Sequence, residues 1–249
     1  MLTDWGTHMN SRLVIAVMAL FATFGAVSTP AVAATGDDWV HQIGTYDYLV
    51  SPDYDGLAPI AAASAGTTLG LGTFDHLDGE LVMVAGQAYR VGTDGTPVRI
   101  DGSQSTPFFE AVRFRPTSSG PVPPGTTCAN LISAVNALAK SDRGIVAVRV
   151  RGTFADLTFR SVPAQTAPYL PLSQVVATQT LFPLGSRKAV LVGFRTAPDL
   201  AGTGAPGLHL HGVTADRTAG GHVISCIVGN DVQLSVQRTA GVQVQGTAH

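Results

Sequence analysis

The chain has 249 residues, of which 45% are hydrophobic and 13% are charged, and its formal net charge is −2. This length is enough for one large domain or two small ones with a buried core, and the composition excludes an intrinsically disordered protein. Because the charge is nearly balanced and Lys and Arg do not cluster, the chain offers no basic surface for nucleic acid. We therefore expect no nucleic-acid partner.

The N-terminus has the order of a secretory signal peptide. Arg12 precedes an apolar run over residues 13–27, and a small-residue A-x-A site follows at residues 31–33. A basic flank, an apolar middle and such a site are typical of export with cleavage. The run is shorter than the roughly 18 to 20 apolar residues that a membrane-spanning helix needs. We predict a signal peptide over residues 1–34, a secreted or cell-envelope protein, and no stable membrane span after cleavage.

Short strands dominate the first part of the mature chain, because β-branched and aromatic runs alternate there with Gly-containing turns. The expected strands cover residues 80–86, 87–95, 96–101, 108–116, 144–154 and 157–162, the last two on either side of Gly152. One clear helix is predicted over residues 128–144. Thr127 is its candidate N-cap, and Leu131, Val135 and Leu138 lie on one face.

A second unit is predicted to begin at residue 163, where three prolines exclude regular structure up to residue 172. A helix capped by Ser173 and further strands follow; they cover residues 173–182, 188–196, 207–215, 222–228 and 232–237. The predicted fold class is α+β and predominantly β. It has two packed mixed or antiparallel β-sheet units, residues 35–162 and 163–249, with a few short helices.

Three histidines in the second unit form a candidate metal site. Side chains at i and i+2 of a strand share a face, so His209 and His211 lie side by side, and the turn at residues 214–221 can bring His222 opposite them. Three imidazoles suit a divalent ion such as zinc and leave one coordination position open, as catalytic sites require. The alternative is two partly exposed strand histidines and one that hydrogen-bonds locally.

Two other interpretations of these residues are disfavoured by the sequence. A cupin-type metal oxygenase also uses H-x-H, but it adds a glutamate three or four residues later, where this chain has Thr214 and Ala215. Cys226 would lie about 13 Å from His222 along one strand, too far to share an ion. Cys128 and Cys226 are the only cysteines, and the sequence leaves open whether they form a disulfide or remain separate thiols.

Four separated segments, in the same order and spacing, resemble the α-acetolactate decarboxylases. They are GLGTFDHLDGELVMVAGQAYRV (70–91), TPFFEAVRFRP (106–116), GTFADLTFRSVPAQTAPYLPL (152–172) and GLHLHGVTADRTAGGHV (207–223). The resemblance covers roughly residues 40 to 230. It implies that His209, His211 and His222 bind Zn²⁺, that Glu80 and Arg160 are catalytic, and that Thr73 lies near the substrate. It also implies a homodimer.

The implied reaction is the decarboxylation of 2-acetolactate to acetoin and CO₂. Loss of CO₂ leaves an electron pair that moves into the neighbouring ketone as an enediolate, and zinc stabilises the developing negative charge as a Lewis acid. Arg160 can orient the departing carboxylate through its planar guanidinium. Glu80, with a pKa raised by burial, can deliver a proton to one face. Without the resemblance, both charged residues would be read as ordinary solvated side chains.

Two departures from the family pattern favour an alternative. The family has a second glutamate in a C-terminal tail, whereas residues 237–249 contain no carboxylate side chain, and Gly212 stands where an aromatic residue is usual. The alternative is therefore a non-catalytic, zinc-binding exported relative that has lost this glutamate.

Overall fold

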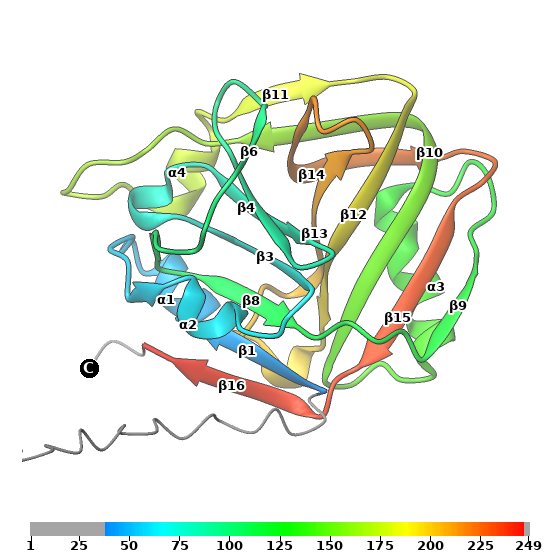
Figure 1. The fold of residues 1–249 in the computed structure, drawn as a ribbon, viewed down its shortest axis with the longest axis horizontal. Helices are drawn as coiled ribbons and strands as arrows, with labels where there is room; N and C mark the ends of the chain where they lie inside the picture. Colours follow the sequence, from blue (N-terminus) through cyan, green and yellow to red (C-terminus); the bar gives the residue numbers. More distant parts are fainter. Residues whose placement is uncertain (1–37, 247–249) are drawn as a thin grey trace, which may run out of the picture. The chain divides into compact units, whose positions relative to one another are not determined.

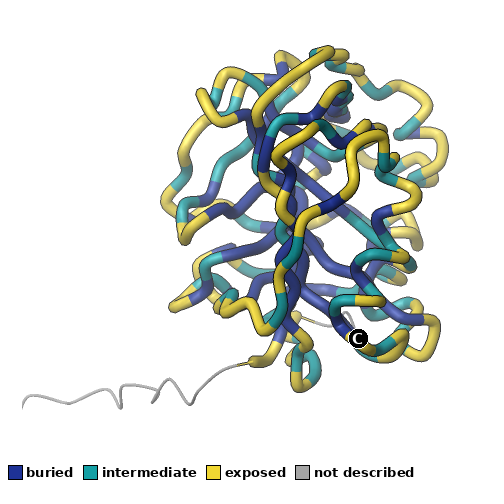
Figure 2. The backbone as a smooth tube through the Cα atoms, turned by 90° about the vertical axis from the view of Figure 1, so that its right-hand side faces the viewer, coloured by how far each residue is buried: buried dark blue, intermediate teal, exposed yellow. Residues whose placement is uncertain are grey.

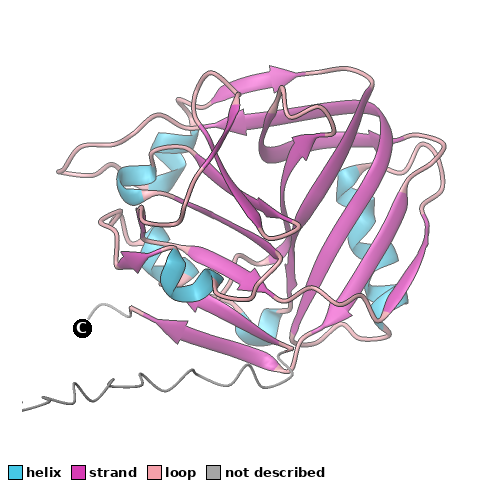
Figure 3. Cartoon of the chain, in the orientation of Figure 1, coloured by secondary structure: helices cyan, strands magenta, loops and turns pink. Residues whose placement is uncertain are grey.

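The computed structural model describes residues 38–246, which form two seven-stranded β-sheets, a separate two-stranded pair and a few short helices (Figures 1 and 3). The predominantly β fold class is confirmed. The expected signal peptide lies outside the described residues. Within them, no helix has the length and apolar character needed to cross a membrane.

The first sheet has seven strands in the order β16-β1-β8-β3-β4-β5-β6. Its strands are β1 (Trp39–Ile43), β3 (Leu69–Thr73), β4 (Glu80–Val84), β5 (Gln87–Val91), β6 (Pro97–Arg99), β8 (Phe109–Val112) and β16 (Gly241–Gln245). All neighbours are antiparallel except β1 and β16, which run parallel. A separate two-stranded pair joins β2 (Ala58–Pro59) to β7 (Ser105–Thr106).

The second sheet is organised around one long strand, β10. Its other members are β9 (Ser118–Pro121), β11 (Thr180–Pro183), β12 (Arg187–Thr196), β13 (Gly207–Thr214), β14 (Gly220–Val228) and β15 (Gln233–Arg238). β10 pairs with β12 and β15 in its first part and with β14 and β11 in its second. Because β12 also pairs with β13 and β13 with β14, these pairings close β10, β12, β13 and β14 into a ring.

The expectation of two strands around Gly152 is wrong, since β10 (Ile145–Ser161) is continuous through it. Gly152 adopts φ +148°, and a Cβ there would lie 2.6 Å from the carbonyl oxygen of Asp231. The glycine therefore allows the backbone of the neighbouring turn to approach closely, and it does not end the strand.

The helices are short and lie at the periphery of the sheets (Figure 3). They are α1 (Tyr46–Val50), α2 (Ala61–Ser64), η1 (Asp75–Leu77), η2 (Cys128–Asn130), α3 (Leu131–Ala139), α4 (Leu172–Val176) and η3 (Pro198–Leu200). The helix predicted over residues 128–144 is present as η2 and α3, but it ends at Lys140, which adopts a left-handed conformation. Thr127 precedes η2 without a side-chain capping bond.

The helix predicted over residues 173–182 is wrong in its second half. α4 ends at Val176, and Thr180 to Pro183 form β11 on the edge of β10. Pairing with an existing strand satisfies the backbone groups of this segment, which overrides its weak helical pattern.

The sequence boundary between residues 162 and 163 does not separate the two sheets. β9 and β10 precede the boundary but belong to the second sheet, and β16 follows it but belongs to the first. Contacts group the described residues into one unit.

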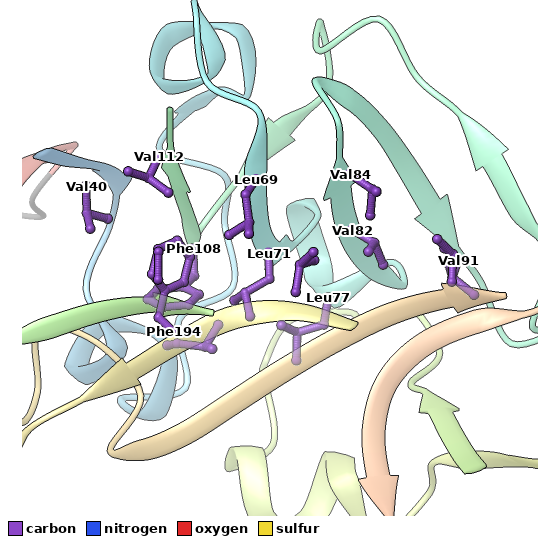
Figure 4. Close-up of a cluster of buried hydrophobic side chains, with 14 of the residues drawn as sticks. Val40, Leu69, Leu71, Leu77, Val82, Val84, Val91, Phe108, Val112 and Phe194 are labelled. Atoms are coloured by element: carbon purple, nitrogen blue, oxygen red, sulfur yellow. The ribbon is translucent and has the colours of Figure 1, made fainter. Parts of the chain in front are cut away.

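Buried side chains fill both the ring and the layer between the sheets. The exposed residues lie mostly in the connections (Figure 2). Leu69, Leu71 and Val82 of the first sheet and Phe194 of β12 belong to one buried cluster in this layer (Figure 4). Val148 and Leu191 contribute to a second cluster, which the ring strands form together with α3 and β15. The candidate site lies at one end of the layer between the sheets, and residues of both sheets line it.

A disulfide joins Cys128 in η2 to Cys226 in β14, which answers the question that the sequence left open. The two cysteines are 98 residues apart in the chain, so the bond closes a long loop in the unfolded protein. It also attaches η2 to the strand that carries His222.

Replacing Cys128 and Cys226 together by Ala should lower the free energy of unfolding by about 2 to 4 kcal/mol, because the unfolded chain regains the entropy that the cross-link removes. Urea denaturation checks this value. The wild-type protein treated with a reductant is the control and should approach the stability of the variant. An unchanged urea midpoint in both samples would contradict the expectation.

Glu110 of β8 is a carboxyl group buried in the layer between the sheets. Its side chain is inaccessible, and neither carboxylate oxygen has a hydrogen-bond partner within residues 38–246. Burial raises the pKa of Glu110 from its ordinary 4.5 to about 8, so the folded protein holds this group protonated at neutral pH.

Glu110→Gln should therefore stabilise the protein at pH 8 but not at pH 4. In the wild type, folding takes up a proton between pH 4.5 and 8, so stability falls across this window by about 1.4 kcal/mol per pH unit at most. The amide has no such dependence. Thermal unfolding at both pH values measures the difference, and pH 4, where both side chains are neutral, is the internal control. An equal midpoint at pH 8 would show that Glu110 ionises freely.

Candidate active site

The three histidines of the sequence prediction meet where β13 and β14 pair. His211 lies directly opposite His222 in the antiparallel register, and His209 lies two residues before His211. Ring centroids are separated by 4.9 to 5.1 Å. His222 Nδ1 lies 3.2 Å from His209 Nε2 and 3.3 Å from His211 Nε2. One nitrogen of each ring thus points to a common centre.

The surroundings keep these imidazoles uncharged. Burial lowers the pKa of His209 to about 3, and the positive charge of Arg160 acts in the same direction. Burial also places the pKa values of His211 and His222 well below the ordinary range. A neutral ring nitrogen has a free lone pair, which a metal ligand requires.

A hydrogen bond on the side away from the other two histidines fixes the orientation of the His211 ring. Its Nδ1 donates a hydrogen bond of 2.8 Å to the carbonyl oxygen of Leu81 in β4, so Nε2 faces the other two rings without a proton. A backbone carbonyl has no sequence signature, so this contact could not have been predicted. It also connects the histidine strands to the first sheet.

Glu80 and Arg160 lie beside the histidines. Arg160 Nη1 is 3.2 Å from Glu80 Oε1, and Glu80 Oε2 is 3.4 Å from His211 Nε2. Arg160 is the cross-strand partner of His222, and Glu80 begins β4. Burial raises the pKa of Glu80 to about 7, although the guanidinium of Arg160 acts to lower it. At neutral pH this carboxyl group can therefore both hold and release a proton.

Thr73 lies across the β3–β4 pair from Glu80, and its side chain is buried. Its hydroxyl donates a hydrogen bond of 2.8 Å to the carbonyl oxygen of Gly79, in the connection that leads to Glu80. Thr73 therefore fixes the start of β4 in addition to lining the site.

A single cavity of about 310 Å³ contains all six residues that the sequence predicts. Its remaining wall is largely apolar and was missed at the sequence level; it includes Tyr46, Leu77, Phe108, Leu172, Val176 and Leu208. These side chains come from separate elements, so only the folded chain reveals that they share a cavity. Among the described residues, Glu80 is the one acidic side chain that lines it.

A second group of possible ligands lies outside this cavity. Asp55, Asp75 and His76 place one ligand atom each within 4.8 Å of the others. They are partly or fully exposed, and Tyr169 donates a hydrogen bond of 2.5 Å to Asp55. Because this group is solvent-exposed and Asp55 already accepts a hydrogen bond from Tyr169, the histidine triad is the stronger candidate for a metal centre.

Comparisons with known proteins give a consistent result. The family described as alpha-acetolactate decarboxylase matches residues 40–248. The alpha-acetolactate decarboxylase of Methanosarcina mazei is 34% identical over 195 residues, which cover 78% of this chain and 68% of the relative. The Klebsiella aerogenes enzyme of the same name is 33% identical over 213 residues, or 86% and 78% of the two chains.

The fold is similar as well. The crystal structure of alpha-acetolactate decarboxylase from Bacillus subtilis strain 168 superposes with a TM-score of 0.79 and 28% sequence identity, covering 83% of this chain and 88% of the other. The resemblance seen in four sequence segments therefore extends through the described chain. The protein belongs to the alpha-acetolactate decarboxylase family.

Proposed function

We propose that this protein is a zinc-dependent enzyme that decarboxylates 2-acetolactate to acetoin and CO₂. Family membership supports the reaction. The observation that carries the proposal is that a three-histidine cluster, a buried carboxyl group with a pKa of about 7 and an arginine line one cavity.

The donor set fits zinc. Three ligands at 2.0–2.1 Å in a tetrahedron around zinc are separated by about 3.3 Å. The distances of 3.2 and 3.3 Å between the ring nitrogens match this value. His209, His211 and His222 would hold the ion, and a fourth position would face the cavity. When bound, zinc supplies a Lewis acid that stabilises negative charge on the oxygens of a substrate.

Arg160 is suited to hold the carboxylate that leaves. Its Nη1 contacts Glu80, while its Nε is buried without a hydrogen-bond partner within residues 38–246. A substrate carboxylate can accept from this N–H, and the planar guanidinium then fixes the direction of the bond that breaks. The carboxylate loses its charge as CO₂ forms, so this ion pair weakens as the reaction proceeds.

Glu80 is suited to supply the proton. When the C–C bond to the carboxylate breaks, its electron pair moves into the adjacent ketone and forms an enediolate. The carbon that lost CO₂ then takes a proton from the Glu80 carboxyl group, which gives acetoin. Because Glu80 lies on one wall, it can reach one face of the planar carbon, and this favours one enantiomer. The apolar wall limits competing protonation by water.

A non-catalytic zinc-binding relative is the alternative function. It is favoured by the finding that Glu80 is the one acidic side chain lining the cavity among the described residues, whereas the resemblance implies two glutamates. Fusing a tail with a glutamate to the C-terminus separates the two proposals. Increased activity would indicate an impaired enzyme, and an unchanged lack of activity would indicate a binding protein.

Export remains part of the proposal. The leader pattern of residues 1–34 supports it, and so does the Cys128–Cys226 disulfide, because such bonds persist in oxidising compartments. Mass spectrometry of the mature protein in the producing cell tests it. A mature N-terminus near Ala34 is expected, and an intact leader in cytosolic protein would contradict export.

The test of function is CO₂ release from racemic 2-acetolactate, with metal content measured on the same sample. We expect about one zinc per chain, activity that stops when a chelator removes the metal, and recovery on adding zinc. A chelator already saturated with zinc is the control for inhibition by the chelator itself. Zinc-loaded protein that releases no CO₂ above the uncatalysed rate would contradict the decarboxylase proposal.

A further inference from the structure

A second cavity lies at the other end of the layer between the sheets. Leu69 at the start of β3 and Val84 at the end of β4, both labelled in Figure 4, line it. Thr73 and Glu80, at the opposite ends of these strands, line the active site. The two sites are thus about 13 Å apart along the strands. The second cavity has a volume of about 280 Å³, and Val190 and Val192 of β12 form its other wall.

Two arginines of β10 also line this cavity. Arg149 and Arg151 are two residues apart in the strand, so their side chains share a face. Arg149 is half-buried, and its Nε is inaccessible and has no hydrogen-bond partner within residues 38–246. Its guanidinium lies 5.1 Å from the ring centroid of Phe114. This ring lies against one face of the guanidinium, and a carboxylate would bind at the edge, where the N–H donors point.

No carboxylate compensates these charges. Within the part of the chain that the structure describes, neither Arg149 nor Arg151 forms an ion pair. Burial lowers the pKa of Arg149, and the neighbouring charge of Arg151 lowers it further. Asp231 lines an adjoining cavity with Arg151 and Lys188, but its Oδ1 already accepts a hydrogen bond from Thr153 N. A partly desolvated pair of like charges is costly unless an anion binds.

A hydroxyl group adds a further donor. Thr68 Oγ1 accepts a hydrogen bond of 2.9 Å from the backbone N–H of Phe114, which leaves its own O–H free to donate. The polar groups of the cavity are therefore donors, while Leu69, Val84, Val190 and Val192 supply apolar walls. We propose that this cavity binds a small carboxylate that carries an apolar chain, with the carboxylate on Arg149 and Arg151. The fork of a guanidinium matches a carboxylate edge.

Calorimetric titration of the zinc-loaded protein with hexanoate tests this site. We expect one saturable site and binding at least about tenfold weaker for hexanamide, which has the same shape without the charge. Arg149→Gln combined with Arg151→Gln should weaken hexanoate binding by at least about tenfold. Arg238→Gln is the matched control, because it removes one charge from the opposite face of the same sheet, beside Val146. It should leave binding unchanged.

Arg160→Gln distinguishes the two cavities. If hexanoate binding is lost in this variant but retained in the Arg149/Arg151 double variant, the anion occupies the active site and the proposal is wrong. Absence of saturable binding, or equal binding of hexanamide, would overturn it as well. Equally tight binding of inorganic phosphate and hexanoate would also overturn the proposal, because the apolar walls would then contribute nothing to the affinity. If the double variant does not fold, Arg151→Gln alone, at an exposed position, gives the same test.

Discussion

Replacing His222 by Gln is expected to remove the metal and to reduce CO₂ release from 2-acetolactate to the uncatalysed rate. His222 Nδ1 is the nitrogen that lies close to both other ligand nitrogens, so its loss leaves two donors that cannot complete the site. The ring is half-buried at the cavity wall, and Gln fills similar space, so the fold should persist. Zinc content after dialysis and the rate of CO₂ release are the two measurements.

His76→Gln is the matched control for this experiment. His76 belongs to the exposed Asp55–Asp75–His76 cluster, which is the other described group that could hold a metal. We expect this variant to keep both zinc and activity. If His76→Gln lost the metal while His222→Gln retained it, the metal would be bound at the Asp55–Asp75–His76 cluster. The proposed function, which needs the metal at the three histidines, would then be wrong.

Glu80→Gln is expected to lower the rate of decarboxylation by about 10² to 10⁴ while zinc remains bound. The amide has nearly the shape of the carboxyl group but cannot transfer a proton, and general acid catalysis typically contributes this factor. The three histidines are unchanged, so metal content should stay near that of the wild type. Protonation by water on either face should also reduce the enantiomeric excess of acetoin, which chiral chromatography measures.

Asp156→Asn is the control for Glu80→Gln, because it also replaces an acidic side chain by an amide but does so outside the cavity. Asp156 lies on β10, as Arg160 does, but it does not line the site. Its rate, zinc content and product enantiomer should equal those of the wild type. Should Glu80→Gln retain full rate and enantiomeric excess, another group must deliver the proton and the role of Glu80 would be wrong.

The candidate metal centre could be predicted from the sequence because its histidines form a local pattern. H-x-H places His209 and His211 on one face by strand geometry alone, and the turn before His222 returns it to them. Glu80 and Arg160 carry no such pattern, and only the family resemblance singled them out. Their convergence depends on contact between two sheets, which involves residues far apart in the chain.

Other features of the fold could not be read from local patterns. A glycine at position 152 suggests the end of a strand, but β10 continues through it. The glycine is needed because the backbone of Asp231 lies too close for a Cβ. The edge pairing of β11 was missed because its pattern suits a short helix equally well. The boundary expected at residue 162 follows the prolines of the connection, whereas strand pairing crosses it in both directions. In each case the deciding partner is distant in sequence.

The parallel pairing of β16 with β1 has a consequence for biosynthesis. β16 is the edge strand of the first sheet and β1 is its neighbour, so β1 has no partner on that side until residues 241–245 have been synthesised. Joining such remote segments is slow, and an open edge attracts other chains. We expect nascent protein to depend on a holdase that shields β1 until its C-terminal partner emerges.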